Sequence, residues 1–546
     1  MTTLDLLSAT MLELWQERDP FRAAPFGHPA AARLLPTMND ASRERRRRAY
    51  DDVARQAADL APEGLSEQDR LTRAVLIEQA AAARDVLALE TECFTVSLAR
   101  EFSTASVLRG MTKVKVVDLD AATAYLARLR ALPEYADNDL ALLRRGVGSG
   151  RAPLSRPLLV ALSELDAYLA TSLDADPLLA ALSGPWREAG ERIVTGVVRP
   201  AIERFVSGVR FDVLDAARPD GRAGVCWLPD GASAYQALLR EETTVDLDPA
   251  VLHDEGLDLH SLAVEEIRAL GKSVFGTADL AEVLDRLRNG PELSYRDGAE
   301  ALSGTRAAMQ AMEDGLPRWF GLPDLPACPV EPMPAATAGH YGAGQYMPGS
   351  VDGTRSGVFY VNTTGTRRRY ETTGMIAGGA VPGSHIFWSY AFRADVPRFR
   401  RVAFVPAFVK GWAAYALGLA HEMGRFEDDL SRLGYAVRQA VNAARLVVDT
   451  GVHALGWHRD QALRFLLEGT ALSERDASVE LERIIAMPGE GPIFSVGGRR
   501  IADARAAAED RMGDRFDIRE FHDRLLENGA LPLETMRSVI DDWASR

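Results

Sequence analysis

Residues Met375–Tyr390 read MIAGGAVPGSHIFWSY, and this segment says most about the fold and the chemistry of the chain. Small residues fill its first half, and Pro382-Gly383 interrupts it before an apolar run. Zinc in proteins is held by about three donors from Cys, His, Asp or Glu, and glycine offers none through a side chain. His385 is the one such donor in this segment. We interpret it either as a core histidine beside aromatic neighbours or as a general acid and base facing a cleft.

In this frame the chain resembles a bacterial family catalogued as domain of unknown function 885, whose site reads His-Glu-x-x-Pro-Gly-His-His. Residues 378–385 read GGAVPGSH, so glycines replace the His-Glu pair and Ser384 replaces the next histidine. A family glutamate in a downstream Glu-Gly-Trp-Ala-Leu-Tyr segment is replaced by Lys410, within KGWAAY. The resemblance implies a large, mainly α, metallopeptidase-like scaffold with a deep cleft. The four replacements predict that no metal and no other cofactor is bound.

The composition is that of an ordinary globular protein and restricts the partners. The chain has 546 residues, 47% of them hydrophobic, and a formal net charge of −15. Such an acidic balance argues against a nucleic-acid or anionic-membrane partner. Its three cysteines are far apart, and its first twenty residues lack the features of a secretory signal. We therefore expect a cytoplasmic protein, and the sequence leaves its oligomeric state open.

Most of the chain has the apolar periodicity of helices. We expect one unit over residues 1–546, with a mostly helical part over 1–325 and a site-bearing part over 326–546. Within the latter, the Gly-, Pro- and Tyr-rich residues 326–365 predict a small sheet or hairpin beside the cleft. Pro133 is expected to punctuate the helical pattern. The clearest helical windows are 69–90, 118–132, 157–171, 187–209, 249–270, 278–289, 401–424 and 434–457.

A polar stripe runs through the apolar segment AVNAARLVVDTGVHALGW, residues 440–457. Arg445, Asp449 and His453 are spaced four residues apart, so a helix places them on one face. One interpretation is an internal Arg–Asp salt bridge that His453 caps. The other is a substrate site, in which Arg445 binds a carboxylate and Asp449 orients His453 for proton transfer. The resemblance places this face beside the former metal site.

Lys410 is one of only four lysines among 63 basic residues, and it lies in the apolar segment AFVPAFVKGWAAYALGLA. It is either a lysine whose ammonium reaches the surface or an ammonium that occupies the space of the former metal. In the second case burial lowers its pKa and suits it to catalysis as a base, an oxyanion donor or a Schiff-base amine.

Further candidates follow from the resemblance. Three tyrosines match the tyrosine-bearing stretch before the family motif: Tyr341 as a catalytic group, and Tyr346 and Tyr360 as substrate-binding groups. Their phenols suit donation to an anionic intermediate, although core aromatics explain them nearly as well. Ser384 and Glu490 are further substrate-binding candidates, the latter in place of a family glutamine.

Three readings of the function remain open. The first is a metal-independent enzyme acting on a small carboxylate- or amide-bearing substrate by hydrolysis, acyl transfer or lyase chemistry. The second is a catalytically inactive pseudo-peptidase that binds a short peptide or a partner protein. The third is a metal-dependent hydrolase with rearranged ligands. His421-Glu422 and His253 are the obvious ligand candidates for it, but neither forms the His-Glu-x-x-His spacing of zinc peptidases.

Overall fold

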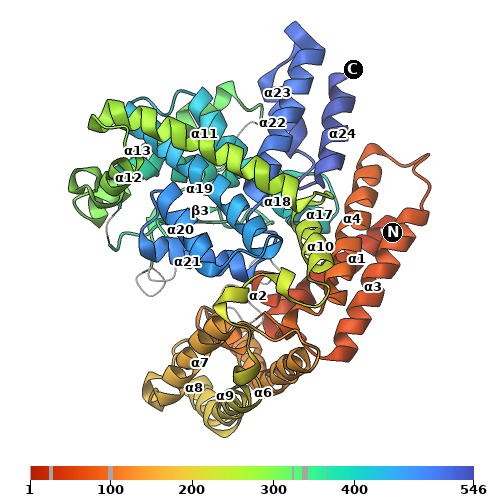
Figure 1. The fold of residues 1–546 in the computed structure, drawn as a ribbon. Helices are drawn as coiled ribbons and strands as arrows, with labels where there is room; N and C mark the ends of the chain where they lie inside the picture. The colour runs from red at the N-terminus through yellow and green to blue at the C-terminus, as the bar shows by residue number, and fades with distance from the viewer. Residues whose placement is uncertain (1, 24–28, 96–102, 323–324, 335–341, 366) are drawn as a thin grey trace.

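The computed structural model describes residues 2–23, 29–95, 103–322, 325–334, 342–365 and 367–546. It is 72% helical with one small sheet, which confirms the predicted mainly-α class (Figure 1). Within the described residues, no helix is long and apolar enough to span a membrane.

The first helices pack against the end of the chain. One hydrophobic core joins Leu4 and Tyr50 to Phe521 and Ile540, and Figure 1 shows both termini on the same side of the molecule. Ser66 caps the longest of these helices by accepting a hydrogen bond from the Asp69 N–H. The N-terminal helices are α1 (Thr3–Arg18), α2 (Pro20–Ala23), α3 (Asp40–Asp59) and α4 (Glu67–Ala88).

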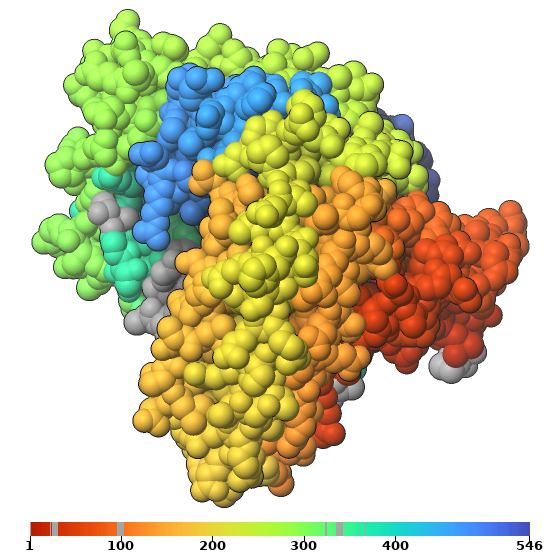
Figure 2. Space-filling view, turned by 60° about the horizontal axis from the view of Figure 1, so that its bottom comes forward, coloured from red at the N-terminus to blue at the C-terminus, as the bar shows by residue number. Residues whose placement is uncertain are grey.

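A second group of helices has a hydrophobic core of its own and projects from the body of the molecule (Figure 2). It contains α5 (Thr104–Thr112), α6 (Leu119–Gly148), α7 (Ser155–Ala170), α8 (Gly184–Ile193) and α9 (Arg199–Asp212). Pro133 does not punctuate this part as expected, because it lies inside α6. A proline removes one helical hydrogen bond, and α6 continues past it with Leu129, Leu132 and Ala136 buried on one face.

The middle of the chain supplies long helices that cover the C-terminal ones. They are α10 (Gly231–Thr243), α11 (Pro249–Phe275), α12 (Leu280–Asn289) and α13 (Gly298–Gly315). Asp248 caps α11 through the N–H groups of the next turn, and Gly276 ends it with φ 75°. α11 packs along α19 (Asp429–His453). Gly256 permits this close approach, because a Cβ there would lie 2.9 Å from Leu446.

The predicted sheet is present, with three short strands. These are β1 (Val330–Pro332), β2 (Gly344–Met347) and β3 (Val358–Val361), in the order β1-β3-β2. β3 pairs in parallel with β1 and antiparallel with β2. Phe359 and Val361 alternate toward the core, while Val358 and Tyr360 are half-buried on the other face.

The C-terminal helices form most of the main core. They are α15 (Thr372–Gly379), α16 (Ser384–Arg393), α17 (Arg398–Val402), α18 (Pro406–Glu422), α19, α20 (Arg459–Gly469), α21 (Glu474–Ala486), α22 (Ile493–Met512), α23 (Ile518–Leu526) and α24 (Leu533–Ala544). A capping box of Asp428 and Ser431 starts α19. α18 and α22 approach at Gly411, where a Cβ would lie 2.4 Å from the Gly497 carbonyl carbon.

The hydrophobic cores group the chain differently from the predicted parts. The main core joins residues 4–83 to residues 239–544, and the second core lies within residues 35–213. The division at residue 325 and the deep cleft stay predictions.

Candidate functional site

The segment that resembles the family motif folds as the end of α15, a turn, and α16. At Gly378 a Cβ would lie 3.1 Å from the carbonyl oxygen of Ala413 on α18, and at Gly379 it would lie 3.1 Å from the ring of Phe359 on β3. The Trp412 indole N–H donates to the carbonyls of Pro382 and Gly383, at 3.1 and 3.0 Å, and fixes the turn. A side chain at either glycine would therefore begin in close contact with the α18 backbone or with the Phe359 ring.

His385 is buried, and both of its ring nitrogens are bonded inside the fold. Nε2 lies 2.6 Å from the carbonyl oxygen of Pro326, and Nδ1 lies 3.0 Å from the hydroxyl of Tyr346. Because a carbonyl only accepts, Nε2 carries the hydrogen and the tyrosine O–H donates to Nδ1. Burial lowers the pKa of His385, so the ring stays neutral at physiological pH. Ser384 is half-buried and donates to the carbonyl of Gly378 at 3.3 Å.

The polar stripe of α19 ties that helix to distant parts of the chain. Arg445 forms a bidentate pair with Glu480 of α21, at 2.7 and 2.9 Å. The predicted internal salt bridge between Arg445 and Asp449 is therefore wrong. Asp449 turns to the loop after α21, where the N–H groups of Gly489 and Gly491 each donate to it at 3.0 Å.

Asp449 also accepts a hydrogen bond from the hydroxyl of Tyr235 on α10, at 2.6 Å. All of these partners donate, which suits a carboxylate, but complete burial opposes the charge. The effect of burial on the pKa of Asp449 is larger than that of the hydrogen bonds, and it raises this pKa to about 7. His453 is also completely buried. Its Nε2 donates to the Ile484 carbonyl at 3.0 Å, and its Nδ1 accepts from the Val225 N–H at 3.3 Å.

Charged side chains of α19 and α21 form a cluster with Glu371, which precedes α15. We name it the α19 charge cluster, and it consists of Glu371, Arg438, Arg445 and Glu480. Arg438 and Glu371 are half-buried. Burial lowers the pKa of Arg438 and raises that of Glu371, and each charge partly offsets the shift of the other. Within the described residues, neither side chain forms a hydrogen bond or a salt bridge.

Lys410 lies on the α18 side of this cluster and is half-buried. Its Nζ is 5.9 Å from the centre of the Phe494 ring on α22, and the Arg445 guanidinium carbon is 5.3 Å from the same ring. The structure thus brings Lys410 and Arg445 together around one aromatic side chain. Glu490 joins them indirectly, since it pairs with Arg483, which lies 3.9 Å from Glu480.

The tyrosine candidates are divided. Tyr346 forms a hydrogen bond with His385, whereas Tyr360 lies on the half-buried face of β3. Tyr341 lies outside the described residues. In the described part of the chain, His385 and Tyr346 form one pair, Lys410, Arg445, Asp449, His453 and Glu490 lie on or around α19, and Ser384 and Tyr360 join neither group.

The residues considered as ligands of a rearranged metal site bond to other side chains. Glu422 pairs with Arg505 at 2.9 Å, and His253 shares a hydrogen bond of 2.8 Å with Thr450. Over the residues that the structure describes, no group of three or more His, Cys, Asp and Glu side chains assembles to hold a metal ion. The prediction of a metal-free protein stays a prediction.

Sequence reasoning missed Arg438. A signal for Arg438 was present, because it precedes Arg445 by seven residues and therefore lies on the same face of α19. Glu371 is distant in the sequence, and only the tertiary structure brings it to that face.

The fold and the site define a mainly-α protein with a small three-stranded sheet and a half-buried charge cluster beside its longest C-terminal helix. The model of a bacterial protein family of unknown function, DUF885, matches residues 20–540, so the chain belongs to that family.

Solved structures similar to this chain include two named as putative lipoproteins. A "putative lipoprotein" from Colwellia psychrerythraea has a TM-score of 0.88 at 21% identity, with 100% of both chains covered. A "putative lipoprotein of unknown function" from Shewanella oneidensis has a TM-score of 0.79 at 15% identity, covering 99% of this chain and 100% of that one. At these identities the likeness shows the fold alone. No curated protein matches the chain.

Proposed function

We propose that the chain binds a small molecule or a short peptide through its carboxylate, at Arg438, and that it lacks peptidase activity. The observation that carries this proposal is the state of Arg438. Its guanidinium lies half-buried in the α19 charge cluster without a hydrogen bond or salt bridge to any described residue. A guanidinium matches a carboxylate with two parallel hydrogen bonds, and partial burial strengthens such a pair. The Arg445 guanidinium, by contrast, already donates two parallel hydrogen bonds to the Glu480 carboxylate.

The bonding of the histidines supports binding over catalysis. Both ring nitrogens of His385 are bonded inside the fold, and so are both of His453. A general base needs a nitrogen within reach of the substrate, and these two rings have none left to offer. The packing at Gly378 and Gly379 points the same way. On this proposal the family's metallopeptidase-like scaffold serves as a receptor with a degenerate motif.

A second candidate is a metal-independent enzyme, and Glu371 is the observation that favours it. Burial raises the pKa of its carboxyl, and the positive charge of Arg438 is the largest influence that opposes this rise. A carboxyl with a raised pKa beside a carboxylate-binding arginine suits general acid and base chemistry on a bound substrate. Lys410, whose Nζ lies 5.9 Å from the centre of the Phe494 ring, would then stabilise negative charge.

The location and the partners are part of the proposal. A cytoplasmic protein without nucleic-acid or membrane partners fits the net charge of −15. The names of the two structural relatives favour the cell envelope instead, so fractionation of the native cells decides between these locations.

Calorimetric titration with Ala-Ala and with its C-terminal amide tests the binding proposal. The wild type should bind the free dipeptide, and loss of the carboxylate should weaken binding roughly tenfold to a hundredfold, as expected for charge-assisted hydrogen bonds. Arg438→Met should cause a similar loss. Arg432→Met is the matched control, because Arg432 lies on the exposed start of α19 and pairs with Asp429. Equal affinity of wild type and Arg438→Met for the dipeptide would contradict the proposal.

The same samples separate the two candidates. Incubation of the dipeptide with metal-free protein should release no free alanine. Release of alanine that Glu371→Gln abolishes, without loss of dipeptide binding, would establish the enzyme instead.

A further inference from the structure

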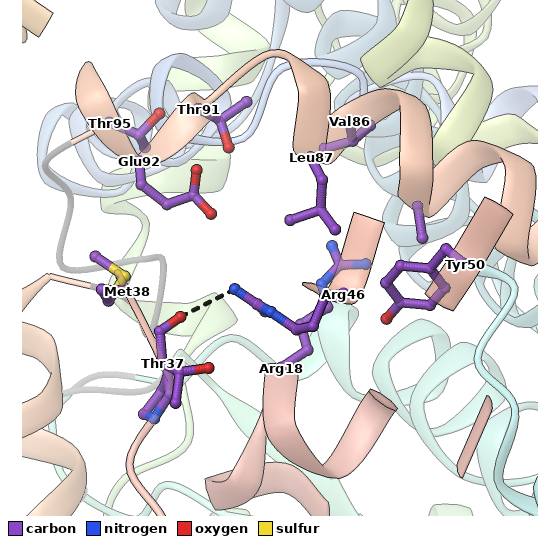
Figure 3. A pocket seen from close by; sticks show the side chains of 12 residues that line it. Arg18, Thr37, Met38, Arg46, Tyr50, Val86, Leu87, Thr91, Glu92 and Thr95 are labelled. Carbon is purple, nitrogen blue, oxygen red and sulfur yellow. Dashed lines mark hydrogen bonds between the residues drawn. The ribbon is translucent and has the colours of Figure 1, made fainter. Parts of the chain in front are cut away.

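Polar side chains without a bonding partner occur in two different surroundings. Around a small cavity between the N-terminal helices, three fully buried atoms bond to no described residue: Arg46 Nε, Thr37 Oγ1 and Glu92 Oε2 (Figure 3). The surrounding packing keeps a ligand from reaching these atoms. Glu371 and Arg438 also lack a bonding partner among the described residues, but both are only half-buried and none of their atoms is enclosed in this way. A small ligand can therefore reach both.

The α19 charge cluster contains two pairs of opposite charges, and they differ. Arg445 and Glu480 are joined by two hydrogen bonds, at 2.7 and 2.9 Å. Arg438 and Glu371 act on each other electrostatically, yet in the described structure they form no salt bridge with each other. We name Arg438 and Glu371 the open pair.

Close packing holds Glu371 beside α19. Gly434 lies four residues before Arg438, and a Cβ there would collide with the carbonyl oxygen of Tyr370. The buried Tyr370 is itself held in place, because its hydroxyl donates to the Leu287 carbonyl at 3.2 Å. The backbone that carries Glu371 is therefore fixed against α19, about one turn from Arg438.

Other charges that act on the open pair already have partners. Arg367 and Arg368 donate to backbone carbonyls at 2.6 and 2.8 Å, and Asp476 accepts from the Ser473 hydroxyl at 2.7 Å. A charge that is partly removed from water costs free energy unless an opposite charge binds it. An occupant that brings one charge of each sign would supply both missing partners.

We propose that the ligand of the α19 charge cluster carries a free amino group as well as a carboxylate, as an α-amino acid or an unblocked short peptide does. This inference rests on the function proposed above and adds a second contact to it. The ligand carboxylate binds Arg438, and the ligand ammonium donates to the carboxylate of Glu371. A simple anion would be attracted by Arg438 and repelled by Glu371, and a simple cation would meet the reverse. The zwitterion gives each member of the open pair a charge-assisted hydrogen bond.

Calorimetric titration of the full chain with Ala-Ala and with N-propionyl-L-alanine tests the inference. N-propionyl-L-alanine is Ala-Ala with a hydrogen in place of the ammonium, so it is no larger and keeps the carboxylate. The wild type should bind it roughly tenfold to a hundredfold more weakly than Ala-Ala. This comparison needs no variant of the protein.

Glu371→Gln keeps the size of the side chain and removes its charge. It should weaken Ala-Ala binding about tenfold or more, and it should remove most of the preference for Ala-Ala over N-propionyl-L-alanine. The preference for Ala-Ala over its C-terminal amide should remain, because Arg438 is unchanged. Glu468→Gln makes the same change at an exposed position of α20 and should leave all of these affinities unchanged. The melting temperature of each unliganded variant shows whether it is folded.

Equal affinity of the wild type for Ala-Ala and N-propionyl-L-alanine would overturn the inference. If the C-terminal amide still bound more weakly in the same titrations, the carboxylate site at Arg438 would stand without the second contact. A folded Glu371→Gln variant with the full preference for Ala-Ala over N-propionyl-L-alanine would also overturn the inference. Failure of the wild type to bind Ala-Ala at all would overturn both proposals.

Discussion

The two halves of α19 use their polar side chains in opposite ways. In the second half, Asp449 and His453 are completely buried, and segments far away in the sequence bond to them. In the first half, Arg438 forms no hydrogen bond or salt bridge with a described residue, and Glu371 and Glu480 act on its pKa through their charge alone. The second half therefore holds distant segments of the fold together, and the proposed carboxylate site lies on the first half.

The difference shows what a shared helix face does and does not imply. Positions 438, 445, 449 and 453 lie on one face, so periodicity alone treats them as one site. What separates them is the chain that packs over each position. The loop after α21 and helix α10 cover Asp449, and neither reaches Arg438 with a bond. Mutations should therefore change stability in one half and binding in the other.

The largest effect is expected for Asp449→Ala. The change leaves the hydroxyl of Tyr235 and the N–H groups of Gly489 and Gly491 buried without an acceptor. Each such loss costs about 1–3 kcal/mol, and we expect a total loss of about 3–5 kcal/mol in the free energy of unfolding. Chemical denaturation of both proteins measures it.

Asp460→Ala is the control, because this aspartate is exposed on the neighbouring helix α20. It should change the free energy of unfolding by less than about 0.5 kcal/mol. If Asp449→Ala were equally mild, the second half of α19 would not be the structural half.

Much of the fold could be predicted because helices and small sheets leave local signals. The window 249–270 lies inside α11, and the Gly- and Tyr-rich residues 326–365 contain all three strands. The prediction at Pro133 was wrong because it considered only the hydrogen bond that a proline removes from a helix. Tertiary packing buries the apolar face of α6 on both sides of Pro133, and this burial keeps the helix continuous.

The site was harder to predict because its bonds connect distant segments. The sequence identified Arg445 but could not show that it forms a salt bridge with Glu480. It also gave no sign that Glu371 lies within the electrostatic influence of Arg438. Tyr346 was a candidate for substrate binding, yet it bonds to His385 across 39 residues. Regular spacing of polar residues predicts that they share one face of a helix, but only the tertiary structure shows which residue each of them bonds to.

An intermediate effect is expected where α15 meets α18, at the motif itself. Gly378→His returns the residue that the family motif has at this position. A Cβ at Gly378 lies 3.1 Å from the Ala413 carbonyl oxygen, so a side chain there requires the α18 backbone to shift by a few tenths of an ångström. Such overpacking costs about 1–3 kcal/mol. We expect this loss on denaturation, and no stoichiometric zinc by elemental analysis.

Gly148→His is the matched control, because a Cβ at Gly148 meets nothing within 4 Å. It should leave the free energy of unfolding nearly unchanged. Stoichiometric zinc in Gly378→His would show that the metal site needs only one more ligand, and it would favour a hydrolase over a receptor.

The smallest effect is expected for Lys410→Met, which tests whether the ammonium belongs to the structural or the ligand-binding part of the cluster. Lys410 is half-buried, and its Nζ lies 5.9 Å from the centre of the Phe494 ring. Loss of a cation–π contact costs about 0.5–1 kcal/mol, and a methionine thioether against the same ring recovers part of it. From this ring contact alone we expect a loss of less than about 1 kcal/mol in the free energy of unfolding, and a smaller change for Lys272→Met, at an exposed position. Dipeptide affinity should also stay within a few-fold of the wild type, because Arg438 supplies the carboxylate contact. A loss of stability above about 2 kcal/mol would show that the ammonium neutralises a buried acidic group, and Lys410 would then belong with Asp449 among the residues that hold the fold together.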